Sequence, residues 1–276
     1  MNAIQRIAAS DGVGLHVEVN GSGTPWLFSC GYCTTRENWR PQVGPLVAEG
    51  AKVILWDYRG HGLSEAPVDK AAYSMSQVVD DMGKILDAVA PDEPVILAGL
   101  SFGGLASLHF ALRWPKRVRG LVLAATGPGF KKAEALERWQ AQVERTAQVL
   151  ESRGCEALVR GKAVRTSIGR DPERPAARVA AEAICSQDPA GVAAFGRYVA
   201  GPAESVIDDL VSIEIPALVV VGEDDSDYLR AADVMAARLP RAERVSIAGA
   251  GHVVNIEAEE AFNEAVKTFQ ASLERT

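Results

Sequence analysis

The apolar positions of the chain fall into short runs that recur at intervals, and several of these runs end at glycine or at an acidic residue. Runs of this length that are rich in valine, isoleucine and leucine are typical of strands. Near the N-terminus, the runs at 4–9 and 14–20 flank Asp11-Gly12, a dipeptide that favours a hairpin turn. Further strands are expected at 26–29, 52–57, 95–100, 121–125, 217–221 and 244–247.

A different spacing, with apolar residues every three or four positions, separates several of these strands. This period predicts amphipathic helices at 76–89, 105–114, 228–239 and 257–273. Strands that alternate with helices form a mainly parallel sheet that is covered on both faces. The expected fold class is therefore α/β, with a doubly wound sheet.

The stretch between Phe130 and Leu210 breaks this alternation. It shows no convincing strand signal, and Pro172, Pro189 and Pro202 divide it into helical pieces. We expect it to form a helical cap, residues 130–210, inserted into a core made of residues 1–129 and 211–276. Basic and acidic residues are equally numerous in this stretch, so its charge indicates no charged substrate.

The composition agrees with one large α/β domain and argues against several classes of partner. The chain has 276 residues, of which 47% are hydrophobic and 24% charged, which is ordinary for a soluble enzyme. Its formal net charge of −7 argues against nucleic acid and against an anionic membrane surface. No stretch approaches the ~20 apolar residues of a membrane span, and the N-terminus lacks the apolar core of a signal peptide. We therefore expect a cytoplasmic location. The expected oligomeric state is a monomer or a homodimer.

The strand expected at 95–100 runs into Gly99-Leu100-Ser101-Phe102-Gly103, a G-x-S-x-G motif that is followed by helical periodicity. This is the context that a nucleophile elbow requires. A serine on so tight a turn takes strained backbone angles, and side chains two residues before and after it would collide. Glycines at these positions remove the collisions, and Gly104 allows the helix to pack closely. We therefore expect Ser101 to present an exposed, nucleophilic hydroxyl.

A serine nucleophile needs a base and an orienting carboxylate, which in hydrolases of this kind follow in the order acid, then histidine. The strand at 217–221 runs into Gly222-Glu223-Asp224-Asp225, and Gly251-His252 follows the strand at 244–247. Together with the elbow and the turn Asp57-Tyr58-Arg59-Gly60-His61-Gly62, these motifs resemble the α/β-hydrolase superfamily over nearly the whole chain. The resemblance implies a serine hydrolase of the esterase or enol-lactonase branch, with neither a metal nor an organic cofactor.

The resemblance assigns Ser101 as the nucleophile and His252 as the general base. The family spacing, three residues after the glycine that ends the strand, selects Asp225 as the acid, with Asp224 and Asp227 as alternatives. The remaining histidines are expected to be structural, and the alternative for one of them, His61, is a substrate contact.

Two backbone N–H groups are expected to bind the oxyanion, because fixed dipoles need no reorganisation when charge develops. The resemblance points to the amides of Phe102, after the nucleophile, and of Tyr32, in the loop after the strand at 26–29. Relatives usually carry His-Gly in this loop, whereas this chain has Cys30-Gly31-Tyr32-Cys33. Enol-lactone hydrolases also often lack the His-Gly pair, which favours a lactone or a compact ester as the substrate.

The same four residues form a C-x-x-C pattern, which is typical of thioredoxin-like redox pairs. The surrounding sequence does not resemble such a domain, and cytosolic thiols are normally reduced, so redox catalysis is not expected. A separate hypothesis is that a Cys30–Cys33 disulfide, formed under oxidising conditions, distorts the Tyr32 amide and switches activity off. Cys155 and Cys185 fall in the expected cap and are interpreted as packing residues.

The sequence thus predicts a hydrolase that cleaves a carboxylic ester or lactone of a small to medium apolar substrate through an acyl-enzyme on Ser101. A carbon–carbon bond hydrolase or a perhydrolase would keep the same triad, and so would a slow-turnover ligand receptor on this fold. Dehalogenases and epoxide hydrolases of this fold need a carboxylate nucleophile, and the serine argues against both.

Overall fold

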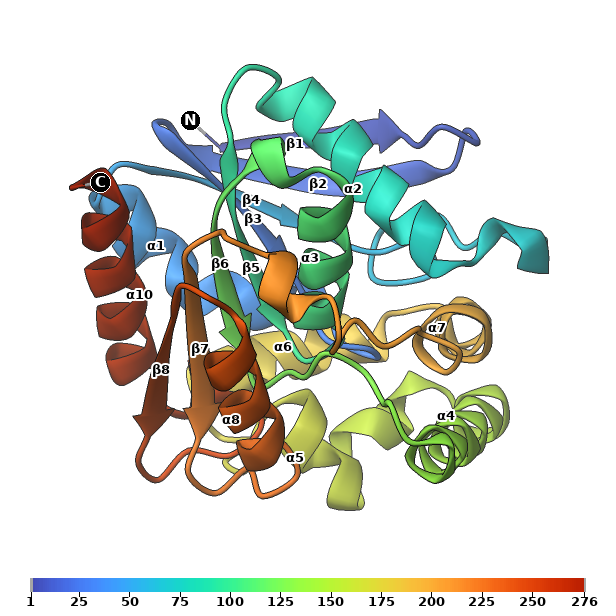
Figure 1. Cartoon of the computed structure of the whole chain (residues 1–276). Coiled ribbons are helices and arrows are strands. Elements are labelled where there is room, and N and C mark those ends of the chain that lie inside the picture. The colour runs from blue at the N-terminus through green and yellow to red at the C-terminus, as the bar shows by residue number, and fades with distance from the viewer. Residues whose placement is uncertain (1, 276) are drawn as a thin grey trace.

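The computed structural model describes residues 2–275, in which a single sheet runs through the molecule (Figure 1). Its strands are β1 (Asn2–Ala8), β2 (Gly14–Gly21), β3 (Thr24–Ser29), β4 (Ala51–Trp56), β5 (Val95–Leu100), β6 (Val118–Ala124), β7 (Ala217–Gly222) and β8 (Ala242–Ile247). The strand order is β1-β2-β4-β3-β5-β6-β7-β8. The β1–β2 and β2–β4 pairs are antiparallel, and the pairs from β4 through to β8 are parallel. Each strand lies within a few residues of the apolar run that predicts it.

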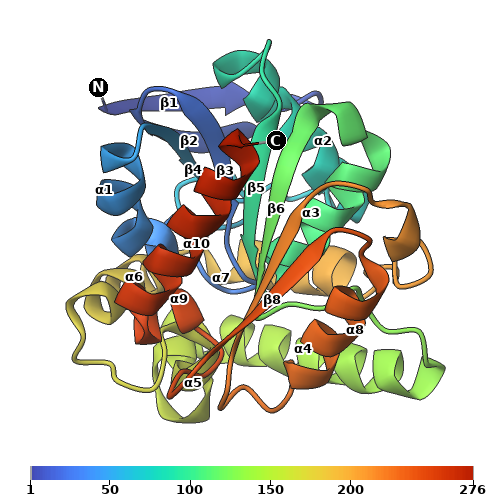
Figure 2. The same cartoon turned by 60° about the vertical axis from the view of Figure 1, so that its left-hand side comes forward.

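Helices cover both faces of the sheet (Figure 2). One face carries α1 (Arg40–Ala48) and α10 (Glu259–Glu274), which pack against each other and on strands of the parallel part. The opposite face carries α2 (Met75–Val89), α3 (Phe102–Arg113) and α8 (Leu229–Arg238). This arrangement confirms the doubly wound, mainly parallel α/β class.

Three helices differ from the sequence expectation. The helix α3 begins at Phe102, because Ser101 is its N-cap residue and no loop intervenes. The helix expected at 257–273 is two helices, α9 (Val254–Glu257) and α10, with Ala258 between them. The helix α1 is not predicted, because it contains Gly44 and Pro45, two residue types that weaken a helical pattern.

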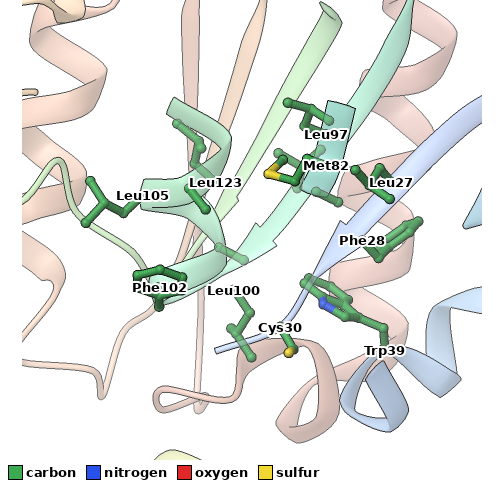
Figure 3. Close-up of a cluster of buried hydrophobic side chains, with 14 of the residues drawn as sticks. Leu27, Phe28, Cys30, Trp39, Met82, Leu97, Leu100, Phe102, Leu105 and Leu123 are labelled. Atoms are coloured by element: carbon green, nitrogen blue, oxygen red, sulfur yellow. The ribbon is translucent and has the colours of Figure 1, made fainter. Parts of the chain in front are cut away.

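The core is densest around the middle strands. All six residues of β5 are buried, so this strand reads as a continuous apolar run. Figure 3 shows Leu97 and Leu100 of β5 among side chains from neighbouring elements, including Phe28 of β3, Met82 of α2 and Phe102 of α3. The carboxyl ends of the parallel strands meet at one edge of the sheet. The chain leaves β5 at this edge, so the residue that follows, Ser101, is attached to the most densely packed part of the core.

Residues 130–210, here called the helical segment, connect β6 to β7. They contain α4 (Ala133–Arg153), α5 (Val164–Ser167), α6 (Pro175–Cys185) and α7 (Pro189–Phe195), and the structure describes no strand among them. Figure 1 shows these helices gathered at the end of the sheet toward which the parallel strands point. Within residues 2–275, none of the helices is both long enough and apolar enough to cross a bilayer.

Candidate active site

Ser101 lies between β5 and α3, at the edge of the sheet where the parallel strands end. Its φ of 53° and ψ of −117° place it in a backbone region that L residues rarely adopt. Its N–H donates to the carbonyl of Ala124 at the end of β6 (2.9 Å), and its carbonyl accepts from the hydroxyl of Thr126. The strained turn expected of a nucleophile elbow is therefore present, and hydrogen bonds to the β6 end hold it.

Three glycines make this turn possible by allowing close approach. A Cβ added to Gly99 would lie 2.2 Å from the carbonyl of Gly103, and one added to Gly103 would lie 2.2 Å from the last carbonyl of β3. A Cβ on Gly104 would lie 2.4 Å from Cγ2 of Thr126. Any larger residue at these positions would displace backbone or a packed side chain. The glycine spacing of the motif therefore has a steric cause.

His252 and Asp225 meet across the ends of β7 and β8. Nδ1 of His252 lies 2.9 Å from Oδ2 of Asp225, and their side chains are only 9% and 7% exposed. An ionised carboxylate only accepts hydrogen bonds, so Nδ1 carries the proton and Nε2 keeps a free lone pair. The alternatives Asp224 and Asp227 are exposed, and Asp224 forms an ion pair with Arg170 (2.7 Å). The geometry therefore favours Asp225 as the partner of the histidine.

Backbone contacts hold the loops of these two residues together. The N–H of Glu223 donates to the carbonyl of Ile247 (3.0 Å), and the N–H of Asp224 donates to the carbonyl of Ala250 (2.9 Å). A Cβ on Gly222 would lie 2.2 Å from that Ala250 oxygen. The glycine that precedes the acidic loop is therefore required by the close approach of the two loops.

Tyr228, a residue for which the sequence suggests no functional role, lies beside both Ser101 and His252. Its ring is tilted by 35° against the imidazole, with ring centroids 4.7 Å apart. Burial raises the pKa of the phenol, and the neighbouring Ser101 hydroxyl opposes part of that rise. Within residues 2–275 the structure shows no hydrogen bond between Ser101 and His252 themselves. A tyrosine after the acidic loop follows no spacing rule, so no sequence signal marks it.

The amides expected to bind an oxyanion lie close to the serine. Gly31, the neighbour of Tyr32, approaches Ser101 so closely that an added Cβ would lie 3.5 Å from the serine Cβ. In the described part of the chain, neither the Tyr32 N–H nor the Phe102 N–H donates to a protein acceptor. Backbone N–H groups without a partner beside a nucleophile are suited to binding a developing anion.

The loop that carries Tyr32 is held by the turn that follows β4. The hydroxyl of Tyr58 donates to the carbonyl of Cys30 (2.9 Å), and the N–H of Cys33 donates to Nε2 of His61 (3.3 Å). His61 is 1% exposed, and its burial lowers its pKa to about 4, so the imidazole is neutral and Nε2 accepts. His61 therefore has a structural contact with the loop in which relatives usually carry a histidine of their own.

The turn itself is fixed by Asp57, the first residue of the D-Y-R-G-H-G motif. Its fully buried carboxylate accepts from the backbone N–H of Arg36 (2.8 Å), from the guanidinium of Arg36 (2.6 Å) and from the N–H of Leu63 (3.0 Å). Gly62 has a φ of +51°, and a Cβ there would lie 2.3 Å from Cγ of Asp57. The motif is thus a compact structural turn beside the site.

Cys30 and Cys33 are both buried free thiols. The thiol of Cys30 donates to the carbonyl of Thr34 (3.4 Å). Burial raises the pKa of both thiols, so they stay protonated at neutral pH, whereas redox catalysis uses the thiolate. This environment argues against a redox pair, and the disulfide switch stays a prediction.

Phe195, the last residue of α7, brings an aromatic ring from the helical segment to the site. It is fully buried, and its ring centroid lies 5.1 Å from that of Phe102, 5.1 Å from that of Tyr58 and 4.6 Å from that of His61. The ring of Tyr32 stacks on it at 6.4 Å. The side of the site that carries the two free amides is therefore lined by aromatic rings.

Comparison with known proteins gives matches over most of the chain. Residues 27–259 match the family model described as alpha/beta hydrolase fold. Among solved structures, the chain is similar to a thermophilic esterase from Thermogutta terrifontis, with a TM-score of 0.82, 26% identity and 99% of each chain covered. It is also similar to the enol-lactonase from Burkholderia xenovorans LB400, with a TM-score of 0.81, 25% identity, and 97% of this chain and 100% of that chain covered. Among curated proteins, it is 28% identical to one from Azorhizobium caulinodans named "Putative carbamate hydrolase RutD", over 95% of this chain and 96% of that one.

Proposed function

The chain belongs to the alpha/beta hydrolase family, and on this basis we propose that it is a serine hydrolase that cleaves a carboxylic ester or a lactone. The observation that carries the proposal is the 2.9 Å contact between His252 and Asp225, close to a serine with a strained backbone. A nucleophile, a base and an orienting acid in one place are what acyl transfer needs. The elbow residue is a serine, which argues for an acyl-enzyme.

In the first half-reaction, Oγ of Ser101 attacks the acyl carbonyl while Nε2 of His252 accepts its proton. Asp225 holds the other imidazole proton on Nδ1 and stabilises the imidazolium that forms. For this step the serine hydroxyl, which neighbours Tyr228, donates to Nε2 of His252. Hydrogen bonds of this kind often tighten only when substrate is bound.

The oxyanion of the tetrahedral intermediate is held by the amides of Tyr32 and Phe102. One such donor is typically worth about 10²–10³ in kcat, because it is already oriented when the charge develops. The imidazolium of His252 then protonates the leaving group. In the second half-reaction, a water molecule gives a proton to His252 and attacks the acyl carbonyl on Ser101. The bond to Oγ then breaks, His252 returns its proton to Oγ, and the carboxylic acid is released. Every step of the proposed mechanism uses only groups of the protein and water.

The proposed substrate has a small to medium apolar acyl part, and the helical segment forms the cap over it. Phe195 reaches the site from this segment and packs on Phe102, which places apolar surface next to the amides. The similarity to an esterase and to an enol-lactonase supports this choice of substrate class. A carbamate has the same acyl carbonyl, so the similarity to the Azorhizobium protein adds one compound class to the test.

The test is hydrolysis of p-nitrophenyl esters from acetate to dodecanoate, together with several lactones and an aryl carbamate. Ser101→Ala is the decisive variant, and Ser226→Ala, an exposed serine in the acidic loop, is its matched control. We expect turnover by the wild type and by Ser226→Ala and none by Ser101→Ala. A phosphonate ester should also label Ser101 covalently, and mass spectrometry locates that label.

Two outcomes would contradict the proposal. Turnover that survives in Ser101→Ala would exclude the acyl-enzyme on this serine. Slow or single turnover on every compound, with a ligand left attached to Ser101 or His252, would instead favour the receptor alternative.

A further inference from the structure

Arg170 belongs to the helical segment, yet its guanidinium reaches the two loops that carry Asp225 and His252. Its Nη1 donates to Oδ2 of Asp224 (2.7 Å), next to Asp225 in the chain. Its Nη2 donates to the carbonyl of Gly249, in the loop that leads to His252. One side chain therefore spans the acid loop and the histidine loop.

The third contact of this guanidinium extends toward His252. Nε of Arg170 donates to Oε2 of Glu257, whose side chain is only 4% exposed. The same Oε2 accepts the backbone N–H of Gly251 (3.1 Å), the residue directly before His252. The chain at Gly169 also passes close to Glu257, since a Cβ added there would lie 2.8 Å from the glutamate Cγ. The nearly buried glutamate thus has a cation on one side and the histidine loop on the other.

The turn that presents Arg170 has an anchor that does not involve this arginine. The side-chain amide of Asn38 donates to the carbonyl of Ser167 (2.7 Å), and the carbonyl of Asn38 accepts from the side chain of Asn255 (2.7 Å). Loss of the Arg170 side chain therefore leaves this end of the helical segment attached to the core. We therefore expect the loss of this side chain to displace the loops that carry Asp225 and His252.

We propose that Arg170 is a positioning residue. From the helical segment it binds the loops of Asp225 and His252 and so fixes the positions of these two side chains relative to each other. This inference rests on the proposed function only for its consequence in catalysis. Without the guanidinium, the Glu257 carboxylate is left nearly buried without its cation, which is unfavourable, so it rearranges and releases Gly251. A displacement of about 1 Å in a catalytic group costs up to about 100-fold in rate.

The test compares Arg170→Ala, Arg170→Lys and Arg174→Ala. Arg174 lines the same surface hollow of about 220 Å³, but among residues 2–275 its guanidinium forms an ion pair only with Asp171, at 3.9 Å, so its variant is the matched control. We expect kcat on p-nitrophenyl acetate to fall 10- to 100-fold in Arg170→Ala, with KM changed less than threefold. Arg170→Lys should recover only part of the loss, because an ammonium group cannot reproduce the planar fork of a guanidinium. Because the hollow opens to solvent, added ethylguanidinium should restore part of the rate in Arg170→Ala.

A second readout does not depend on turnover. Hydrogen exchange of the Gly251 and Asp224 amides should become at least 10-fold faster in Arg170→Ala and stay unchanged in Arg174→Ala, with similar melting temperatures. Unchanged exchange in Arg170→Ala would overturn the inference. A rise in KM alone would also overturn it, since Arg170 would then act on substrate binding. If the wild type hydrolyses nothing, the proposed function fails, and the exchange data still decide whether Arg170 holds the loops.

Discussion

Acidification should destabilise the protein through His61, because this histidine is buried in its neutral form and takes up a proton only at low pH. Its Nε2 accepts the N–H of Cys33, and its side chain is 1% exposed. Protonation would turn this acceptor into a donor that faces another donor, and it would place a charge among aromatic rings. The cost appears as a pKa lowered by burial from 6.5 to about 4.

The sign and the size of the effect follow from proton linkage. The unfolded chain binds a proton at His61 near pH 6.5, whereas the folded protein binds it only near pH 4, so stability is lost as the pH falls through this window. Each pH unit between the two pKa values is worth about 1.4 kcal/mol, which sets an upper limit of about 3.5 kcal/mol. Between pH 7 and pH 4.5, His61 should lower the free energy of unfolding by about 2 kcal/mol.

The assay is urea unfolding of the wild type and of His61→Gln, followed by circular dichroism at pH 8, 7 and 4.5. Glutamine is neutral throughout and offers an oxygen to the Cys33 N–H. We expect the wild type to lose about 2 kcal/mol more than the variant between pH 7 and 4.5. Between pH 8 and 7 the two losses should be equal, which serves as an internal control. Equal losses over the acidic range, or an NMR titration of His61 near pH 6.5, would refute the reasoning.

Three substitutions test the site itself, each with kcat on p-nitrophenyl acetate as the measurement. Asp225→Asn should lower kcat by about 10⁴-fold with the fold intact, because an amide no longer favours the tautomer of His252 that carries its proton on Nδ1. A loss below 10-fold would exclude Asp225 as the acid. Tyr228→Phe keeps the ring on the imidazole and removes one hydrogen-bonding group, so a change of about fivefold is expected, and a loss above 100-fold would give the phenol a chemical role. Gly196→Ala places a Cβ 2.1 Å from the hydroxyl of Tyr32, and it should lower kcat about 10-fold by displacing the loop that carries the Tyr32 amide. Gly44→Ala is its control, because nothing lies within 4 Å of the new Cβ, and it should leave kcat unchanged.

The parts of the fold that were predicted from sequence are those with a local cause. A buried strand such as β5 needs six consecutive apolar residues, and the pattern is visible without knowledge of its neighbours. The elbow is partly local, because Gly99 is required by its close approach to Gly103 and Gly104, whereas Gly103 is required by the last carbonyl of the distant strand β3. After β7, the spacing implied by the resemblance to the α/β-hydrolases selects Asp225, and Asp225 contacts His252.

The parts that were not predicted depend on contacts between distant positions. Arg170 meets Glu257 across 87 positions, and neither residue lies in a motif that indicates the other. The contact between Cys33 and His61 spans 28 positions and joins a loop and a turn that the sequence presents as separate motifs. Tyr228 precedes the first residue of α8, and the periodicity that predicts this helix does not indicate that the tyrosine ring meets His252.

The C-G-Y-C loop nevertheless gains a physical explanation from these distant contacts. Relatives that carry a histidine in this loop can hold it from within, whereas here the loop is held from outside by Tyr58 and His61. Both residues come from one turn, which Asp57 fixes through three hydrogen bonds. The position of the Tyr32 amide therefore depends on a neutral histidine in another element, while the position of Ser101 depends on β5, α3 and the end of β6. Conditions that protonate His61 should thus disturb the oxyanion site first and leave the nucleophile elbow in place.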